Sequence, residues 1–127
     1  VDIDRGSVEP RVARLDNEGR HAISSVTVTE LRHGVNMRYD EGPDRQNALD
    51  DLDRLLARFD LFAVDRAVAT AAADIISSLR QQGKPLHDLH DVYVAATAAV
   101  EQLPVLTANV DHFERIDSVT VVDWATY

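Results

Sequence analysis

Three short stretches of this chain carry oxygen-bearing side chains beside apolar segments. Glu30 follows the apolar centre of residues 21–25, Asp91 precedes an uncharged run rich in Ala and Val, and Asp111 follows residues 104–107. Converging carboxylates repel one another unless a cation neutralises them, and hard divalent cations such as Mg²⁺ or Mn²⁺ prefer oxygen ligands. The three stretches therefore predict a divalent metal site. Four further polar side chains occur at the same places: Ser25, Asp88, Thr107 and Asn109.

Each of these residues also has a structural interpretation. Asp88 or Asp91 could be the cap of a buried helix, because a carboxylate there is favoured by the unpaired N–H groups and the helix dipole. The hydroxyls of Ser25 and Thr107 could orient water or simply cap the backbone at the end of a strand. Three histidines, His87, His90 and His112, could suggest zinc, but they lack a helix-borne pair of ligands. We interpret them as polar groups that hydrogen-bond carboxylates or substrate.

The spacing of apolar residues predicts the elements that position these side chains. Helices are expected at residues 8–18, 26–37, 43–58, 65–82 and from 91 onward, strands at 21–25, 61–64, 104–107 and 119–122, and a helical turn or loop at 109–115. Short apolar strands separated by helices predict an α/β fold with a central, mostly parallel sheet covered on both faces. Sites in such sheets lie at the carboxyl ends of the strands, where the candidates above are found.

Length and composition narrow the class of protein. The 127 residues predict a single domain, and the absence of cysteine excludes disulfides and cysteine metal sites. No apolar run approaches the roughly 20 residues that span a membrane, so we expect a cytoplasmic protein without membrane contact. With 22 acidic against 13 basic residues, the chain does not suit a broad basic surface for nucleic acid. A bound divalent cation could still meet phosphate groups.

Three motifs in this order resemble those of a known family. They are ISSVTVTEL at residues 23–31, DVYVAATA at 91–98 and LTANVDHFERI at 106–116, with VDW closing at 122–124. Together they resemble the PIN domain, most closely the VapC-type toxin ribonucleases of type II toxin–antitoxin systems. The resemblance implies a three-layer α/β/α fold and a ribonuclease that cleaves RNA with Mg²⁺ or Mn²⁺. It also implies a cognate antitoxin protein as partner.

The resemblance assigns catalytic metal ligands by motif. Glu30 matches the acidic residue of the first motif and Asp91 that of the second. The third motif of the family often has Asp just before Phe, where this chain has His112; Asp111 one place earlier is our candidate, with Asn109 as the alternative. Asp88 and His112 are expected to act from outside the direct ligands or on the substrate.

One departure from the family pattern leaves a second hypothesis open. The family begins with a strand that ends in an acidic ligand, whereas here the Arg-Gly turn already stands at residues 5–6, so we infer that this first strand is missing from residues 1–127. Asp4 could replace that ligand only if the region is shortened. The alternative function is a catalytically inactive PIN-like interaction module. We also expect a homodimer, since VapC-type proteins pair through their first helices and Met37 and Tyr39 provide apolar surface there.

Overall fold

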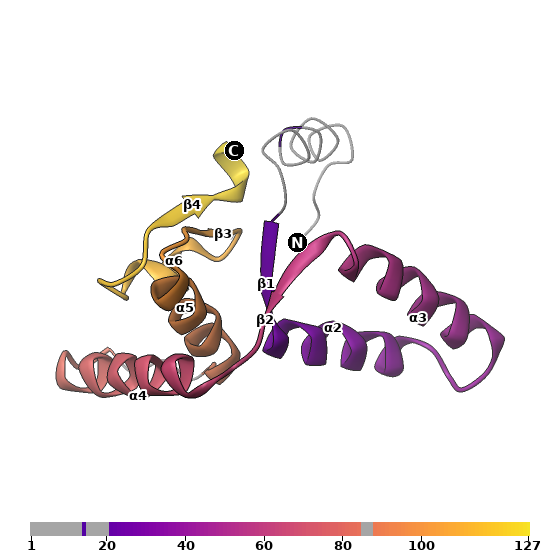
Figure 1. Cartoon of the computed structure of the whole chain (residues 1–127), viewed down its shortest axis with the longest axis horizontal. Helices are drawn as coiled ribbons and strands as arrows, with labels where there is room; N and C mark the ends of the chain where they lie inside the picture. Colours follow the sequence, from indigo (N-terminus) through magenta and orange to yellow (C-terminus); the bar gives the residue numbers. More distant parts are fainter. Residues whose placement is uncertain (1–13, 15–20, 85–87) are drawn as a thin grey trace.

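The computed structural model describes residue 14 and residues 21–84 and 88–127, and Figure 1 shows their arrangement. The predicted helix at 8–18 lies outside these ranges apart from Arg14, as do Asp4 and His87. The described elements are, in chain order, β1 (His21–Ser24), α2 (Ser25–Arg38), α3 (Pro43–Leu56), β2 (Phe59–Phe62), α4 (Arg66–Gln81), α5 (Leu89–Glu101), β3 (Val105–Thr107), α6 (Val110–Glu114), β4 (Val121–Asp123) and the 3-10 helix η1 (Trp124–Thr126).

The strands pair in parallel, as the alternation with helices predicts. β1 pairs with β2 in a register that places His21 opposite Phe59, and β3 pairs with β4 with Val105 opposite Val121. Within the described ranges the four strands form these two pairs and not one continuous ladder. The α/β class with parallel strands is confirmed. Every described strand is only three or four residues long, so the helices supply most of the packed surface.

The helices lie on two sides of the β1–β2 pair (Figure 1). α2 and α3 run side by side at one end of the molecule, and α4 and α5 pack against each other at the other end. α5 also contacts β1, β3, α2 and α6, so it joins both strand pairs. Because α5 touches elements from both halves, residues at its start are held near the segments that follow β1 and β3.

The core forms between α4 and α5. One face of α4 is buried along its length by Val68, Ala72, Ile75 and Leu79, which recur at the spacing of a helical face. From α5, Ala95 and Ala96 have no exposed surface. Small side chains let a helix approach its neighbours closely, and larger core side chains fill the remaining space. The prediction that α5 is buried on most of its surface is confirmed.

Caps explain several element boundaries. The Asp65 carboxylate accepts the N–H of Val68 at 2.9 Å and starts α4, and the Ser24 hydroxyl accepts that of Val26 at 3.2 Å and starts α2. The Ser24 cap therefore fixes the start of α2 despite the β-branched residues in this helix. β2 begins two residues before the predicted strand at 61–64, because its limits follow from pairing with β1.

Two further findings concern apolar segments. Trp124 is half-buried and stacks on Tyr127 with ring centroids 6.1 Å apart. In the described part of the chain, no helix combines the length and the hydropathy needed to cross a bilayer.

Candidate metal centre

The start of α5 carries two acidic residues with different environments. Asp88 is the exposed N-cap, and its carboxylate accepts the N–H of His90 at 3.0 Å. Asp91 lies in the first turn and is only 7% exposed. Unpaired N–H groups and the helix dipole favour negative charge at this end. The capping interpretation is therefore confirmed for Asp88, whereas Asp91 is buried for a reason that the cap does not explain.

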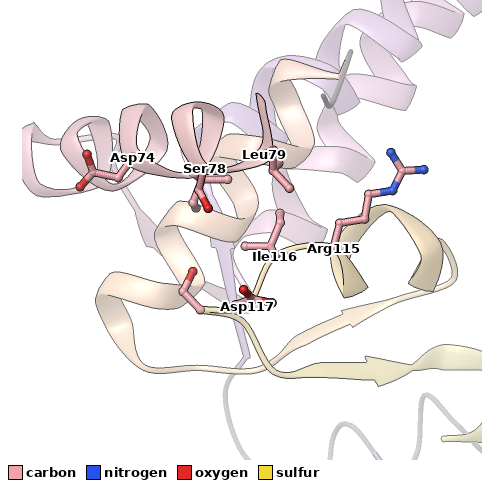
Figure 2. Close-up of a pocket in the computed structure, with 8 residues that line it drawn as sticks. Asp74, Ser78, Leu79, Arg115, Ile116 and Asp117 are labelled. Carbon is pink, nitrogen blue, oxygen red and sulfur yellow. The ribbon is translucent and has the colours of Figure 1, made fainter. Parts of the chain in front are cut away.

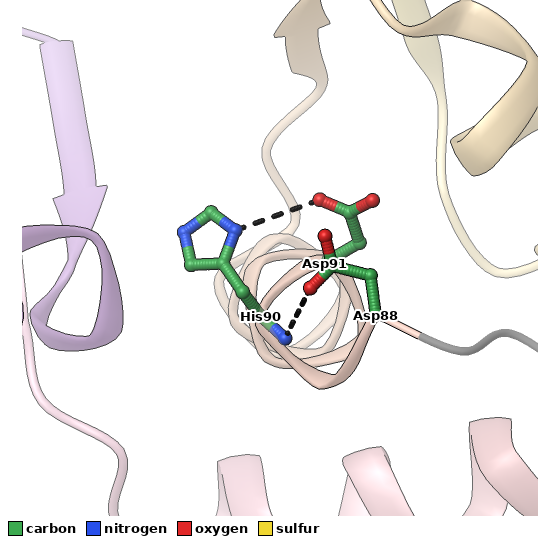
Figure 3. Close-up of side chains that lie close together, drawn as sticks. All are labelled: Asp88, His90 and Asp91. Atoms are coloured by element: carbon green, nitrogen blue, oxygen red, sulfur yellow. Dashed lines mark hydrogen bonds and ion pairs between the residues drawn. The ribbon is translucent and has the colours of Figure 1, made fainter. Parts of the chain in front are cut away.

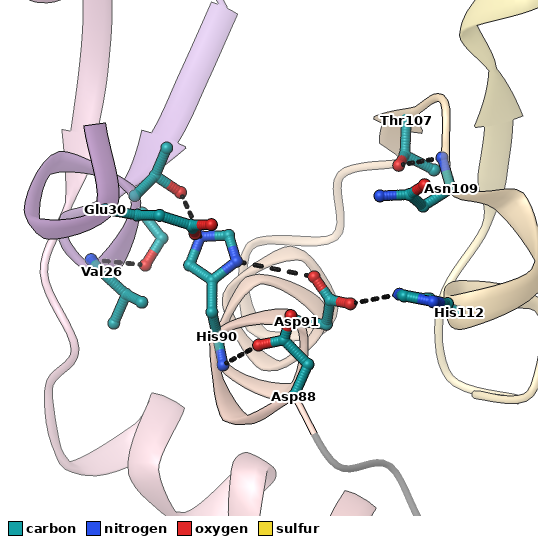
Figure 4. A network of polar contacts seen from close by, with 10 residues as sticks. Val26, Glu30, Asp88, His90, Asp91, Thr107, Asn109 and His112 are labelled. Atoms are coloured by element: carbon teal, nitrogen blue, oxygen red, sulfur yellow. Dashed lines mark hydrogen bonds and ion pairs between the residues drawn. The ribbon is translucent and has the colours of Figure 1, made fainter. Parts of the chain in front are cut away.

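A polar network runs from α2 through Asp91 to α6 (Figure 4). His112 of α6 places Nδ1 2.7 Å from Asp91 Oδ2, and on the other side His90 Nδ1 lies 3.5 Å from Asp91 Oδ1. The other ring nitrogen of His90, Nε2, lies 2.8 Å from Glu30 Oε2 on α2. The network thus links α2, α5 and α6 through alternating carboxylates and imidazoles. The interpretation of His90 and His112 as partners of carboxylates is confirmed.

The hydroxyl groups at the strand ends have backbone partners. Thr107 accepts the N–H of Asn109 at 2.9 Å, and Ser25 accepts the N–H of Val64 at 3.2 Å. Ser25 thereby ties the start of α2 to the segment after β2. Both hydroxyls therefore bind backbone groups, and their role toward water or substrate stays a prediction. Thr107 and Asn109 lie beyond Asp91 as seen from Glu30 (Figure 4).

One group of residues within the described ranges has the spacing of metal ligands. Asp88, His90 and Asp91 each offer an atom within 4.8 Å of the others (Figure 3). Ligand atoms of one ion lie about 3 to 4.4 Å apart when each is about 2.0 to 2.2 Å from it, so small side-chain rotations suffice. Two carboxylates and an imidazole are a donor set that suits a divalent cation. The residues therefore fit a metal ion at this helix start.

The three predicted metal ligands differ in their position relative to the group of Asp88, His90 and Asp91. Asp91 belongs to it, and Glu30 reaches it through His90. Asp111 is exposed in the first turn of α6, and its carboxylate makes no hydrogen bond or ion pair with other described residues. Its role as a ligand stays a prediction. His90 was predicted as a hydrogen-bonding partner of carboxylates or substrate and not as a member of this group; its place directly before Asp91, in the expected first turn of a buried helix, is the signal that could have indicated it.

A separate hollow lies away from this centre (Figure 2). It has a volume of about 210 Å³ and is lined by α4 and by the segment after α6, including Asp74, Ser78, Arg115 and Asp117. None of the predicted site residues lines it. It is therefore not part of the candidate metal centre, although Asp74 provides an exposed carboxylate for control experiments.

Several known proteins are similar to this chain in fold and sequence. The family model of the PIN domain matches residues 2–119. The tRNA(fMet)-specific endonuclease VapC of Shigella flexneri is 32% identical over 109 residues, which are 86% of this chain and 79% of that protein. The structure of FitAcB from Neisseria gonorrhoeae superposes with a TM-score of 0.78 at 30% identity, covering 100% of this chain and 91% of that one. VapBC-5 from Mycobacterium tuberculosis, of the VapBC family of toxin-antitoxin systems, gives a TM-score of 0.65 at 28% identity and covers 80% of each chain.

The parallel strands, the helices around them and the carboxylates at the start of a buried helix agree with the PIN domain that the family model identifies. The match extends over nearly the whole chain, and the relatives include named ribonucleases. The chain belongs to the PIN domain family and, within it, to the VapC ribonucleases, whose reaction is the hydrolysis of RNA phosphodiester bonds. The predicted family is confirmed.

Proposed function

We propose that this chain cleaves RNA internally with the help of Mg²⁺ or Mn²⁺ bound at the start of α5. The observation that carries the proposal is Asp91, a carboxylate 7% exposed that lies between two imidazoles. Burying a charge is costly unless it is paired or coordinates a metal. A buried carboxylate between two imidazoles, in a chain that belongs to the VapC ribonucleases, supports a role for Asp91 in the reaction.

The residues around Asp91 prepare the site. The α5 backbone fixes its position, and His112 holds Oδ2 while Oδ1 faces His90. Glu30 and Asp111 are the other two predicted ligands, on α2 and α6. When bound, the ion supplies the positive charge that activates water and stabilises the leaving oxygen. Thr107 and Asn109, on the far side of Asp91, are proposed to contact the substrate (Figure 4).

RNA cleavage tests this proposal. Purified protein is incubated with a fluorescently labelled pool of structured RNAs in millimolar Mn²⁺ or Mg²⁺, and again with excess EDTA. Cleavage should require the metal and fall by at least about 100-fold in Asp91→Asn. The control Asp74→Asn changes an exposed carboxylate of α4 outside the site. Equal rates for the parent and Asp91→Asn would refute the assignment.

Partners follow from the relatives. We propose that a cognate antitoxin protein restrains the activity, because the similar VapBC-5 belongs to a family of toxin-antitoxin systems. We also propose a cytoplasmic homodimer. Met37 is 74% exposed and Leu31 of the same helix is 41% exposed, which gives α2 apolar surface for a second copy. Light scattering at micromolar concentration should give the mass of two chains, and Met37→Glu should shift it toward one.

The alternative is an inactive interaction module. It is favoured by the expectation that the first strand, with its acidic ligand, is missing from residues 1–127. That expectation stays a prediction, and the coding sequence upstream of Val1 tests it directly. An apolar strand ending in Asp would support the nuclease. If no such strand is encoded and the protein does not cut RNA with either metal, the interaction module is the better hypothesis.

A further inference from the structure

Helix α2 has a glycine on a face that other described residues leave open. The helix runs from the β1–β2 pair toward one end of the molecule (Figure 1), and none of its 14 residues is buried. A Cβ added at Gly34 would meet no atom within 4 Å, and the φ of Gly34 is not in the left-handed region. Glycine inside a helix is less stable than alanine. Neither packing nor backbone conformation in the described part of the chain therefore explains Gly34.

The residues around Gly34 form a symmetric pattern. Leu31 and Met37 lie three residues before and after it, and they are 41% and 74% exposed. Glu30 and Arg38 lie four residues before and after it. Residues three and four apart are neighbours on a helix surface, so these four side chains surround Gly34 on one face. The centre of this face is a position without a side chain.

This pattern is complementary to itself. In a two-fold interface, a residue that contacts a second residue of the partner is contacted in the same way by that partner. If two copies of α2 cross antiparallel at Gly34, Leu31 meets Met37 of the second copy and Glu30 meets Arg38 of the second copy. The first pair is apolar and the second has opposite charges. A glycine at the crossing lets the two backbones approach closely.

Both charged groups are available for such a pair. The side chain of Glu30 is 59% exposed although its Oε2 lies 2.8 Å from His90. A carboxylate has two oxygens with several acceptor sites, so Glu30 can also accept from a guanidinium. The Arg38 guanidinium lies 5.7 Å from the centre of the Tyr39 ring and makes no ion pair with a carboxylate in the described ranges.

We propose that two copies of the chain pair through α2, crossing antiparallel at Gly34, so that Arg38 of each copy lies beside Glu30 of the other. The inference rests on the homodimer of the proposed function and specifies its interface. Each candidate metal centre then receives a cation from the second copy at its edge. A guanidinium in this place suits the phosphate groups of an RNA substrate.

Cysteine cross-linking tests the direction and the register of the crossing. The chain contains no cysteine, so introduced cysteines react alone. Leu31→Cys and Met37→Cys copies with tags of different size are mixed, allowed to exchange and treated with a short bis-maleimide. The mixed product should dominate over the product of either variant alone. Asn36→Cys, exposed on the opposite side of α2, is the matched control and should not cross-link with Met37→Cys.

Substitution of Gly34 separates the interface from the fold. Gly34→Leu has room in the single chain, so circular dichroism should show unchanged helix content. Its side chain would stand between the crossing helices, and the dissociation constant of the dimer, measured by analytical ultracentrifugation, should rise by at least about 10-fold. Asn36→Leu makes a similar change on the opposite side and should keep the dimer.

A charge exchange tests the pair of Glu30 and Arg38. Arg38→Glu should weaken the dimer by about 10-fold, because two carboxylates then face each other. Combining it with Glu30→Arg should restore the dimer, whatever happens to the metal centre. Arg32→Glu changes an exposed arginine that lies away from Gly34 on the same helix, and it should leave the dimer unchanged.

These experiments need neither RNA nor metal, so their outcomes are separate from the cleavage assay. A dimeric parent without the mixed cross-link, or with an unchanged dimer in Gly34→Leu, would overturn the crossing while the nuclease stands. A monomeric parent at micromolar concentration would also overturn it. The mixed cross-link in a protein that does not cut RNA would support the crossing and count against the nuclease.

Discussion

Asp91→Asn should remove most of the stabilisation of the fold by Mn²⁺. The substitution keeps the size and most of the hydrogen bonding of a side chain that is only 7% exposed, but it removes its charge. An ion that binds the folded state and not the unfolded chain stabilises by about 2.7 kcal/mol at 100 times its dissociation constant. The parent protein should therefore melt at a clearly higher temperature with Mn²⁺ than without it.

The size of the shift follows from the length of the chain. Unfolding entropy of about 2.1 cal/mol/K per residue over 127 residues gives about 0.27 kcal/mol/K. A gain of about 2.7 kcal/mol then raises the melting temperature by about 10 °C. If Asp91→Asn weakens binding about 100-fold, the same Mn²⁺ concentration equals its dissociation constant and adds only about 0.4 kcal/mol, or about 1.5 °C.

Scanning calorimetry of each protein with and without Mn²⁺ measures these shifts. Each variant is compared with its own metal-free form, so a change in intrinsic stability does not enter. Asp74→Asn on α4 should keep the full shift, since this exposed residue lies outside the metal centre. Asp111→Asn decides whether the predicted third ligand contributes. A shift in Asp91→Asn as large as that of the parent would show that Mn²⁺ binds elsewhere, and the reasoning would fail.

Three further predictions concern the fold, and urea unfolding measures each. Gln102→Gly should stabilise the folded protein by about 0.5 to 1 kcal/mol, because Gln102 ends α5 at a left-handed φ of 56°. The control Gln82→Gly, at the right-handed end of α4, should destabilise it. Changes of the same sign in the two variants would contradict this reasoning. Asp65→Ala should cost about 1 kcal/mol by removing the cap of α4, with Asp65→Ser largely restoring it. Ala95→Leu should cost about 1 to 3 kcal/mol, since Ala95 has no exposed surface, and an unchanged midpoint would show that the core can expand.

The helices could be predicted closely because their signals are local. The apolar repeat that includes Leu49 and Leu52 predicts α3, and Asp65 predicts the start of α4, each within about two residues. The predicted strand at 61–64 was two residues too late, because the bounds of a strand only four residues long are set by the strand it pairs with. Phe59 is in the strand since it lies opposite His21, a contact between residues far apart in the sequence. Such register is not encoded in the segment itself.

The carboxylates of the centre and the histidines beside them could be predicted, but which imidazole meets which carboxylate could not. Asp91 was identified by motif and by its place before a buried helix. His112 meets it only because α6 packs against α5, 21 residues further along the chain. His90 meets Glu30 only because α2 packs against α5. These imidazole contacts depend on helix packing, which local sequence patterns do not determine.

The alanines of α5 connect this packing to the chemistry. Ala95 and Ala96 are fully buried and lie one turn after Asp91, so the helix start is held by the same close contacts that form the core. Asp91 does not need a flexible loop to bring it to the site, and its position is as rigid as the core behind it. His90, on the same turn, is partly exposed, and its ring lies between Glu30 and Asp91. Because the core holds this carboxylate, one helix start can complete the core and also provide the oxygen ligand that the proposed metal site needs.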